Sequence, residues 1–177
     1  MSEYTTQMGA ARNGIITPQM KIVAEKEHMD AEEIRQLVAK GQVIIPCNKK
    51  HTSIHPNGVG SRLTTKINVN LGVSRDWKDV DMEYEKVRSA VEMGAESIMD
   101  LSSYGDTRTF RRKLTQDCPA MIGTVPIYDA VVYYHKPLGQ ITSEEWLDIV
   151  RMHAEDGVDF MTIHCGMNRA TAARFKE

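Results

Sequence analysis

Lys66-Ile-Asn-Val-Asn70 is the first of four short, strand-like runs in this chain that each give way to polar or ligand-like residues. The other three are Ser97-Ile-Met-Asp-Leu101, Ile122-Gly-Thr-Val-Pro-Ile-Tyr128 and Phe160-Met-Thr-Ile-His164. Parallel βα sheets and barrels build their binding sites at the carboxyl ends of their strands. If the four runs are successive strands, the polar residues at their ends converge on one pocket.

Helix signals separate these runs. A helix is expected over Asp81–Met93, another after Asp106, a short one over Ile127–Tyr134, and one from the capping box Thr142-Ser-Glu-Glu145. Strand–helix alternation with near-continuous apolar strands favours parallel pairing and right-handed crossovers. We expect the strands to be Lys66–Leu71, Glu96–Leu101, Ala120–Pro126 and Val158–His164, and a further helix from Asn168.

Two α/β architectures fit this pattern, a doubly wound sheet and half of an eight-stranded barrel. A complete barrel typically needs about 250 residues, and the chain has 177. Residues up to about Gly41 predict two short helices, which begin after Thr17-Pro18 and Asp30. From Cys47 to Gly60 the composition is typical of a loop. We therefore expect an N-terminal segment at 1–60 and four βα units at 61–177.

Composition narrows the class of protein. Hydrophobic residues make up 41% of the chain and charged residues 26%, as in globular proteins. A formal charge of -2 gives no basic footprint for nucleic acid and no polybasic patch for a membrane. Cys47, Cys118 and Cys165 fit reduced thiols better than a disulfide framework. With neither a signal-peptide pattern nor an apolar run of membrane-spanning length, a cytoplasmic location is expected.

The side chains at the expected strand ends suit a polar small molecule. Asn70 can donate and accept hydrogen bonds, Met99 pairs an apolar contact with the neighbouring Asp100, and Tyr128 offers a ring and a hydroxyl. His164 can be a hydrogen-bond partner, an acid or base, or a metal ligand. Singly, each has a structural alternative as a cap, a core residue or a satisfied histidine. Their convergence at one rim is what indicates a pocket.

Two other groups are weaker candidates. His51 and His55 are four residues apart, but the surrounding proline and glycines argue against the helix that would place them on one face, so no metal site is expected there. Arg108, Arg111 and Arg112 share a helix whose first turn Asp106 already caps. We expect these arginines to form a solvated face.

Several stretches, in order along the chain, resemble the phosphomethylpyrimidine synthase family, S-adenosylmethionine radical lyases of the thiamin pathway. They are Thr6-Gln-Met8, Gly14-Ile-Ile-Thr-Pro18, Ile44-Ile-Pro-Cys-Asn48 with His51, Lys66-Ile-Asn-Val-Asn-Leu-Gly72, Met99-Asp-Leu-Ser102, Ile122-Gly-Thr-Val-Pro-Ile-Tyr128, Glu155-Asp-Gly-Val-Asp159 and Thr162-Ile-His164. The resemblance runs essentially from end to end, and it looks like only the N-terminal portion of that family's chain.

The resemblance implies the first half of a (βα)8 TIM-type barrel after a small N-terminal segment, in a cytoplasmic homodimer. It implies a carbon–carbon lyase that converts 5-aminoimidazole ribotide to 4-amino-5-hydroxymethyl-2-methylpyrimidine phosphate by radical chemistry. In the family an asparagine, a methionine, a tyrosine and a histidine at the first four strand ends contact the imidazole ribonucleotide. These positions match Asn70, Met99, Tyr128 and His164.

The resemblance also implies three cofactors, namely S-adenosylmethionine, a [4Fe–4S] cluster and zinc, whose ligands would lie outside this chain. The cysteines present lack the clustered spacing of an iron–sulfur motif. We expect the isolated chain to be inactive. Two alternatives remain open at this stage: the sister 5-hydroxybenzimidazole synthase, which makes a cobamide base from the same ribotide, and a non-catalytic half-barrel binding module that dimerises to bury its open edges.

Overall fold

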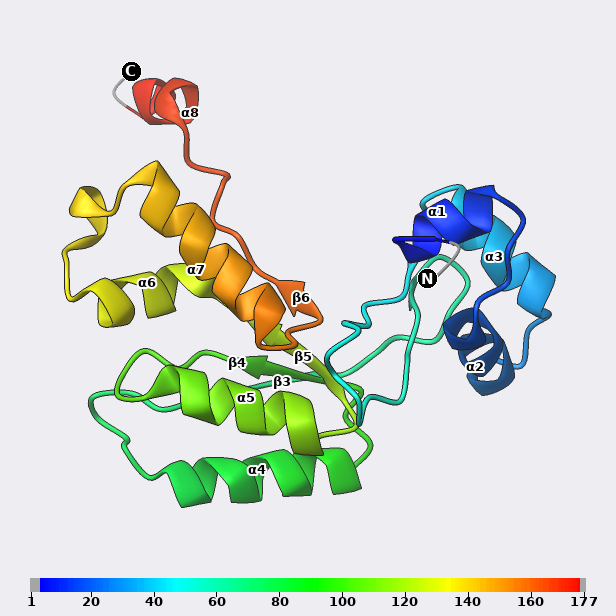
Figure 1. The fold of residues 1–177 in the computed structure, drawn as a ribbon, viewed down its shortest axis with the longest axis horizontal. Helices are drawn as coiled ribbons and strands as arrows, with labels where there is room; N and C mark the ends of the chain where they lie inside the picture. Colours follow the sequence, from blue (N-terminus) through cyan, green and yellow to red (C-terminus); the bar gives the residue numbers. More distant parts are fainter. Residues whose placement is uncertain (1–3, 176–177) are drawn as a thin grey trace.

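A computed structural model describes residues 4–175, which form an α/β body with a helical unit at its amino-terminal side (Figure 1). The body holds a parallel four-stranded sheet whose strands follow one another in chain order. They are β3 (Asn68–Leu71), β4 (Ser97–Asp100), β5 (Met121–Thr124) and β6 (Phe160–Met161). The expected parallel pairing is confirmed, and parallel strands in chain order are compatible with part of a barrel.

Helices connect the strands, and in Figure 1 α4 and α5 lie below the sheet whereas α6 and α7 lie above its far end. The elements are α4 (Val80–Glu92), α5 (Thr107–Asp117), α6 (Pro126–Tyr134), the short 3₁₀ helix η1 (Leu138–Gln140), α7 (Ser143–Glu155) and α8 (Arg169–Arg174). No helix within residues 4–175 is both long enough and apolar enough to cross a membrane.

Local capping explains where these helices begin. The Asp106 carboxylate accepts the Thr109 N–H at 3.0 Å, and the Asn168 amide oxygen accepts the Thr171 N–H at 2.9 Å. Thr142 and Glu145 form the expected reciprocal capping box at the start of α7. Pro126, expected to end the third strand, instead opens α6, where its missing N–H would have had no helical partner.

The two faces of the sheet differ in chemistry. On the helix-covered face, Ile98 and Ile122 pack with Phe110 and Leu114 of α5 in one fully buried cluster. Neighbouring residues of a strand point to opposite faces. The other face therefore carries Asn68, Asn70, Met99 and Gly123, and the register places Asn70, Met99 and Gly123 side by side on adjacent strands.

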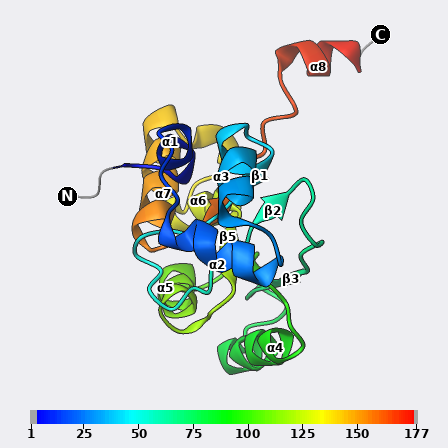
Figure 2. The ribbon, with the colours of Figure 1, turned by 90° about the vertical axis from the view of Figure 1, so that its right-hand side faces the viewer.

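The N-terminal unit has an apolar core of its own, in which Met20, Ile34 and Val38 are buried. It consists of α1 (Gln7–Arg12), α2 (Pro18–Lys26), α3 (Ala31–Ala39) and an antiparallel pair of strands, β1 (Val43–Ile44) and β2 (Val59–Gly60). Figure 2 shows these helices in front of the sheet. Sequence reasoning missed α1, whose small Gly9, Ala10 and Ala11 give no apolar stripe.

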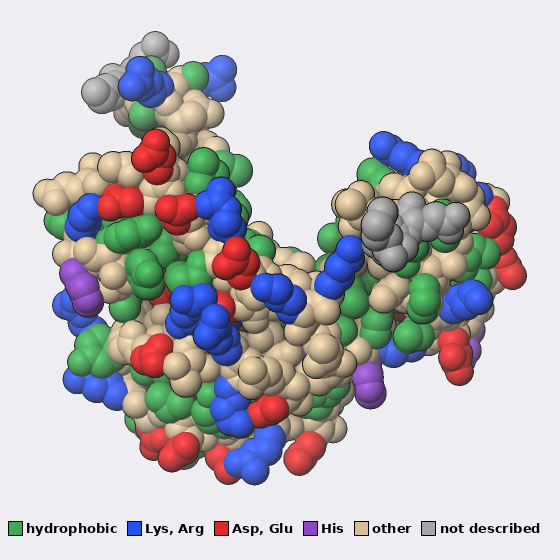
Figure 3. Space-filling view, in the orientation of Figure 1, with side chains coloured by type: hydrophobic (Ala, Val, Ile, Leu, Met, Phe, Trp, Pro, Cys, Tyr) green, Lys and Arg blue, Asp and Glu red, His purple; other side chains and the backbone are tan. Residues whose placement is uncertain are grey.

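A side-chain clamp fastens the loop between β1 and β2 to the body. The Asn48 amide donates to the carbonyls of Ala154 and Val158 at 2.8 and 2.9 Å. Ser53 Oγ and a ring nitrogen of His51 share the carbonyl of Cys118. On the N-terminal side, Lys26 Nζ donates to the carbonyls of residues 55 and 56. In the views of Figures 1 and 3 a notch separates the N-terminal helices from α7.

The fourth strand is shorter than expected. Only Phe160 and Met161 form β6, although a hydrogen bond from Thr162 N to Thr124 O (2.8 Å) continues the contact with β5. The phenyl ring of Phe160 in β6 packs directly over Gly123 in β5. A Cβ added at residue 123 would lie 2.3 Å from that ring, so this contact requires glycine. His164 therefore lies three residues beyond the last strand residue.

Candidate functional site

Residues that follow each of the four strands line one cavity of about 1060 Å³, which we call the strand-end cavity. Arg75 comes after β3, Tyr104 after β4, Tyr128 after β5 and His164 after β6. The remaining lining residues are Ser103, Gly105, Ile127, Val131, Val132, His135, Lys136, Pro137 and Leu138. A concave site at this edge of a parallel sheet is the usual place for a ligand.

Tyr128 and His164 meet in this cavity. Their ring centroids are 5.9 Å apart and the rings are tilted by 47°. Tyr128 lies in the first turn of α6, where its N–H donates to Val125 O at 3.0 Å. Both side chains are exposed to the cavity rather than packed into the core. A tyrosine hydroxyl and an imidazole are thus available to one ligand.

Asn70 and Met99 form a second pair, on the open face of the sheet. They are register partners on β3 and β4 and are not among the residues that line the strand-end cavity. The Asn70 side-chain oxygen accepts from Asn68 Nδ2 at 2.8 Å, and Asn68 Oδ1 accepts from Ser97 Oγ at 2.8 Å. This row fixes the Asn70 amide, whose NH₂ group makes no hydrogen bond to any described residue and can donate to a ligand.

Asp100 does not join the other expected residues. Its side chain points to the helix-covered face, opposite to that of Met99, and is 5% exposed. Burial raises the pKa of this carboxyl to about 6, against a hydrogen bond from Ser102 that lowers it. Asp100 therefore supports the wall of the site, and its expected place at the pocket rim is wrong.

Hydrogen bonds join the segments that follow β3 and β4. Leu101 N donates to Leu71 O (2.8 Å), Ser103 N donates to Val73 O (2.9 Å), and Val73 N donates to Ser102 Oγ (3.1 Å). Gly72 has φ +141°, and a Cβ there would lie 2.6 Å from Ser102 N, so only glycine allows this approach. The cavity wall formed by these two segments is thus built from one continuous hydrogen-bonded ladder.

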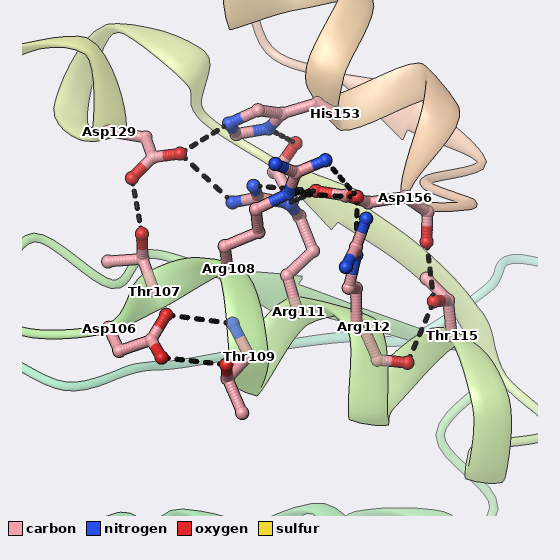
Figure 4. A network of polar contacts seen from close by, with 11 residues as sticks. Asp106, Thr107, Arg108, Thr109, Arg111, Arg112, Thr115, Asp129, His153 and Asp156 are labelled. Carbon is pink, nitrogen blue, oxygen red and sulfur yellow. Dashed lines mark hydrogen bonds and ion pairs between the residues drawn. The ribbon is translucent and has the colours of Figure 1, made fainter. Parts of the chain in front are cut away.

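Between α5, α6 and the end of α7, a buried polar network replaces the solvated arginine face expected from the sequence (Figure 4). Arg111 is 1% exposed and its guanidinium contacts Asp129 Oδ2 at 3.0 Å and Asp156 Oδ2 at 2.9 Å. Arg108 and Arg112, which are partly exposed, bind the same Asp156. The network joins α5 to α6 and to the end of α7, so it positions the helix that carries Tyr128.

His153 of α7 completes the network. Its Nε2 lies 2.9 Å from Asp129 Oδ2 and its Nδ1 lies 2.9 Å from Thr124 Oγ. Burial lowers the pKa of His153 despite the nearby Asp129, so the ring is neutral, with Nε2–H donating to the aspartate and Nδ1 accepting from the hydroxyl. Thr107 Oγ1 also donates to Asp129. The network is therefore internally satisfied and offers no free group to a ligand.

The described residues do not fit a metal centre. No group of three or more histidine, cysteine or acidic side chains gathers anywhere in residues 4–175. Both ring nitrogens of His51 are engaged by Asp159 and the Cys118 carbonyl, whereas His55 is exposed. Cys118 is buried and Cys165 exposed, in different parts of the fold, and no described cysteine forms a disulfide. These thiols cannot hold an iron–sulfur cluster together.

Comparison with known proteins finds a family and relatives that match nearly the whole chain. The model of the radical SAM ThiC family matches residues 6–177. The phosphomethylpyrimidine synthase of Alkaliphilus oremlandii (strain OhILAs) is 61% identical over 175 residues, which is 99% of this chain and 40% of that protein. Those of Clostridium novyi (strain NT) and Clostridioides difficile (strain 630) are 62% and 59% identical over 173 residues, 98% of this chain and 40% of each relative. The chain thus spans about 40% of the length of these curated relatives.

Proposed function

The chain belongs to the radical SAM ThiC family, and from this we propose that it is the ribotide-binding part of a phosphomethylpyrimidine synthase. In this proposal the whole enzyme converts 5-aminoimidazole ribotide to 4-amino-5-hydroxymethyl-2-methylpyrimidine phosphate, as a carbon–carbon lyase of thiamin biosynthesis. The observation that carries the proposal is the meeting of Tyr128 and His164 in one cavity at the strand ends.

Each proposed substrate residue has a distinct role. The free NH₂ group of Asn70 donates a hydrogen bond to the ribotide, and Met99 beside it supplies an apolar contact. His164 hydrogen-bonds the ligand, and Tyr128 both packs against it and hydrogen-bonds it. Strong binding of a polar ligand requires such fixed partners, because groups left unpaired on desolvation weaken binding.

We assign no cofactor ligand to this chain. The family implies S-adenosylmethionine and a [4Fe–4S] cluster, and the resemblance adds zinc, but the thiols and imidazoles described above do not gather into a site. The radical chemistry belongs to those cofactors. The residues of this chain contribute by binding and orienting the ribotide.

The proposal extends to architecture. We propose that residues 1–60 form one unit and that 61–177 form the first four βα units of a TIM-type barrel, in a homodimeric cytoplasmic enzyme. The separate apolar cores of α2–α3 and of the sheet support this division. An isolated 177-residue chain is expected to lack activity. Sedimentation analysis of the full-length protein tests the dimer, and a monomer at micromolar concentration would contradict it.

A titration tests the binding residues. In the full-length protein, Asn70→Ala and His164→Ala should each weaken ribotide binding by about 1–3 kcal/mol, because a ligand group is left unpaired. Asn13→Ala and His55→Ala are matched controls, since both side chains are exposed and lie outside the cavity. Unchanged ribotide affinity in the first two variants would remove the assignment.

The comparisons favour this reading over the two alternatives. The relatives reported above are all named phosphomethylpyrimidine synthase. 5-Hydroxybenzimidazole synthase acts on the same ribotide, so the mass of the product made by the full-length protein separates the two enzymes. A non-catalytic module would bind the ribotide and release neither product.

A further inference from the structure

The lining of the strand-end cavity has a one-sided charge. Its thirteen residues include Arg75, Lys136, His135 and His164 but no aspartate or glutamate, although the chain as a whole has more acidic than basic residues. Lys78 Nζ lies 4.8 Å from the centroid of the Tyr104 ring, which belongs to the lining, and adds a further cation next to it. A cavity of this kind favours an anionic ligand group.

Arg75 is the cation in this lining whose backbone lies in a hydrogen-bonded turn and whose guanidinium is unengaged. It lies in a closed turn, in which Ser74 N donates to Trp77 O at 2.8 Å and Trp77 N donates to Ser74 Oγ at 3.2 Å. The turn continues directly from Val73, which is held by the ladder to the segment after β4. The Arg75 side chain makes no ion pair or hydrogen bond with any residue in 4–175.

The other full cation of the lining is already engaged. Lys136 Nζ binds the Glu145 carboxylate, which belongs to the capping box of α7. The contrast extends to the arginines of α4, α5 and α7: Arg88, Arg108, Arg111, Arg112 and Arg151 each bind a carboxylate. An arginine without a carboxylate partner, on an anchored turn at a cavity, has its planar set of donors available for an oxyanion.

We propose that Arg75 binds the phosphate monoester of the ligand that occupies the strand-end cavity, while Tyr128 and His164 hold its imidazole ribose portion. This inference rests on the proposed function, since it takes the ligand to be a ribotide. Arg75 is thus a binding residue that recognises the charged end of the substrate and makes the site select a ribotide over the corresponding riboside.

Calorimetric titration of the full-length protein with imidazole ribotide and with imidazole riboside, which lacks only the phosphate, tests the inference. The unsubstituted protein should bind the ribotide more tightly. Arg75→Ala should weaken ribotide binding about 10- to 100-fold and leave riboside binding unchanged, since a charge-assisted contact is lost. Arg75→Lys, which keeps the charge but not the paired donors, should recover part of the loss. Arg88→Ala, on the exposed side of α4, is the matched control.

Several outcomes would overturn the assignment. Ribotide affinity within about twofold of the unsubstituted protein, or equal losses for ribotide and riboside in Arg75→Ala, would show that Arg75 does not contact the phosphate. A loss of S-adenosylmethionine affinity with ribotide binding intact would assign the arginine to that cofactor's carboxylate instead. If the unsubstituted protein binds neither ribotide nor riboside, the proposed function itself fails. Identical thermal unfolding of the variants excludes misfolding as a cause.

Discussion

The Nδ1 atom of His51 lies 2.7 Å from Oδ2 of Asp159, and both side chains are fully removed from solvent. Its Nε2 lies 2.7 Å from the carbonyl oxygen of Cys118, so both ring nitrogens face acceptors and both carry protons. Asp159 also accepts the backbone N–H groups of Asn48 and Ile122, each at 2.7 Å. One buried ion pair therefore ties the clamp loop to the start of β5.

This pair makes stability depend on pH. Burial alone lowers the pKa of His51, but the hydrogen bond and charge of Asp159, with the Cys118 carbonyl, outweigh it and raise the pKa above 6.5. The stabilisation is fully present below the unfolded-state pKa and is lost as pH rises through the folded-state value. His51→Gln should reduce the free energy of unfolding by about 3–5 kcal/mol at pH 6.

The deficit of His51→Gln should shrink as the pH is raised from 6 to 9, as followed by urea unfolding. His55→Gln is the matched control, because the His55 side chain is exposed and its hydrogen bonds run through the backbone. A deficit that stays constant over this range would show that His51 is neutral in the folded protein.

The Asp156 carboxylate should respond in the opposite direction. Burial raises its pKa, but hydrogen bonds from Arg108, Arg112 and Arg111 outweigh this effect and lower it. Its stabilisation is present above the unfolded-state pKa of about 4 and is lost as pH falls through the folded-state value. Asp156→Asn should cost about 3–5 kcal/mol at pH 7, because it leaves Arg111 buried without this charge.

The control for Asp156 is the exposed Asp148, which pairs with Arg151 on α7. Asp148→Asn should cost less than about 1 kcal/mol, as is typical of surface pairs. Equal losses in the two variants at pH 7, measured by urea unfolding, would contradict the role given to the buried network.

Asp100→Asn should stabilise the protein at neutral pH. The folded-state pKa of Asp100 is raised to about 6, so ionisation disfavours the folded state as pH rises between the unfolded- and folded-state values. An asparagine oxygen can still accept the Ser102 N–H, now at 2.9 Å, without a buried charge. We expect a gain of about 3 kcal/mol at pH 8 that vanishes near pH 3.5. A loss of stability at pH 8 would mean that the carboxylate is compensated when ionised.

Substitutions at Gly123 and Phe160 should have coupled effects on the free energy of unfolding. Gly123→Ala places a methyl group against the Phe160 ring, and overpacking of this kind costs about 1–3 kcal/mol. Adding Phe160→Leu should recover part of the loss, which a double-mutant cycle in urea unfolding measures. Gly166→Ala, where no atom lies within 4 Å of the added methyl, should have little effect. Additive losses in the double variant would contradict this contact.

Features set by neighbouring residues could be predicted from the sequence. The caps at Thr17, Asp106, Thr142 and Asn168 involve partners three residues away, and each begins a helix as expected. The parallel sheet followed from strand–helix alternation. β6 is shorter than the expected Val158–His164, because Ile163 continues the apolar pattern past Met161, where the pairing ends.

Features set by distant partners could not be predicted. Arg111 is buried because its guanidinium binds the carboxylates of Asp129 and Asp156. These partners lie 18 and 45 residues further along the chain, so no local pattern reveals them. The direction of Asp100 was ambiguous because Ser97-Ile-Met-Asp100 is buried or half-buried at every position, so alternation gives no signal. Tyr128 and His164 meet as expected, whereas Arg75, in an unremarkable polar turn, is identified only by its place in the cavity.

The clamp between the N-terminal unit and the body consists largely of side chains that bind carbonyl oxygens. Asn48, Ser53 and His51 grip the main chain at residues 118, 154 and 158, and no side chain at those three positions takes part. At these three positions the attachment depends on the course of the backbone and not on the side chains, whereas at Asp159 it depends on the carboxylate that binds His51. Substitutions at residues 118, 154 and 158 that preserve the backbone can therefore leave these hydrogen bonds in place, whereas a one-residue insertion among them would move the carbonyl oxygens away from their donors.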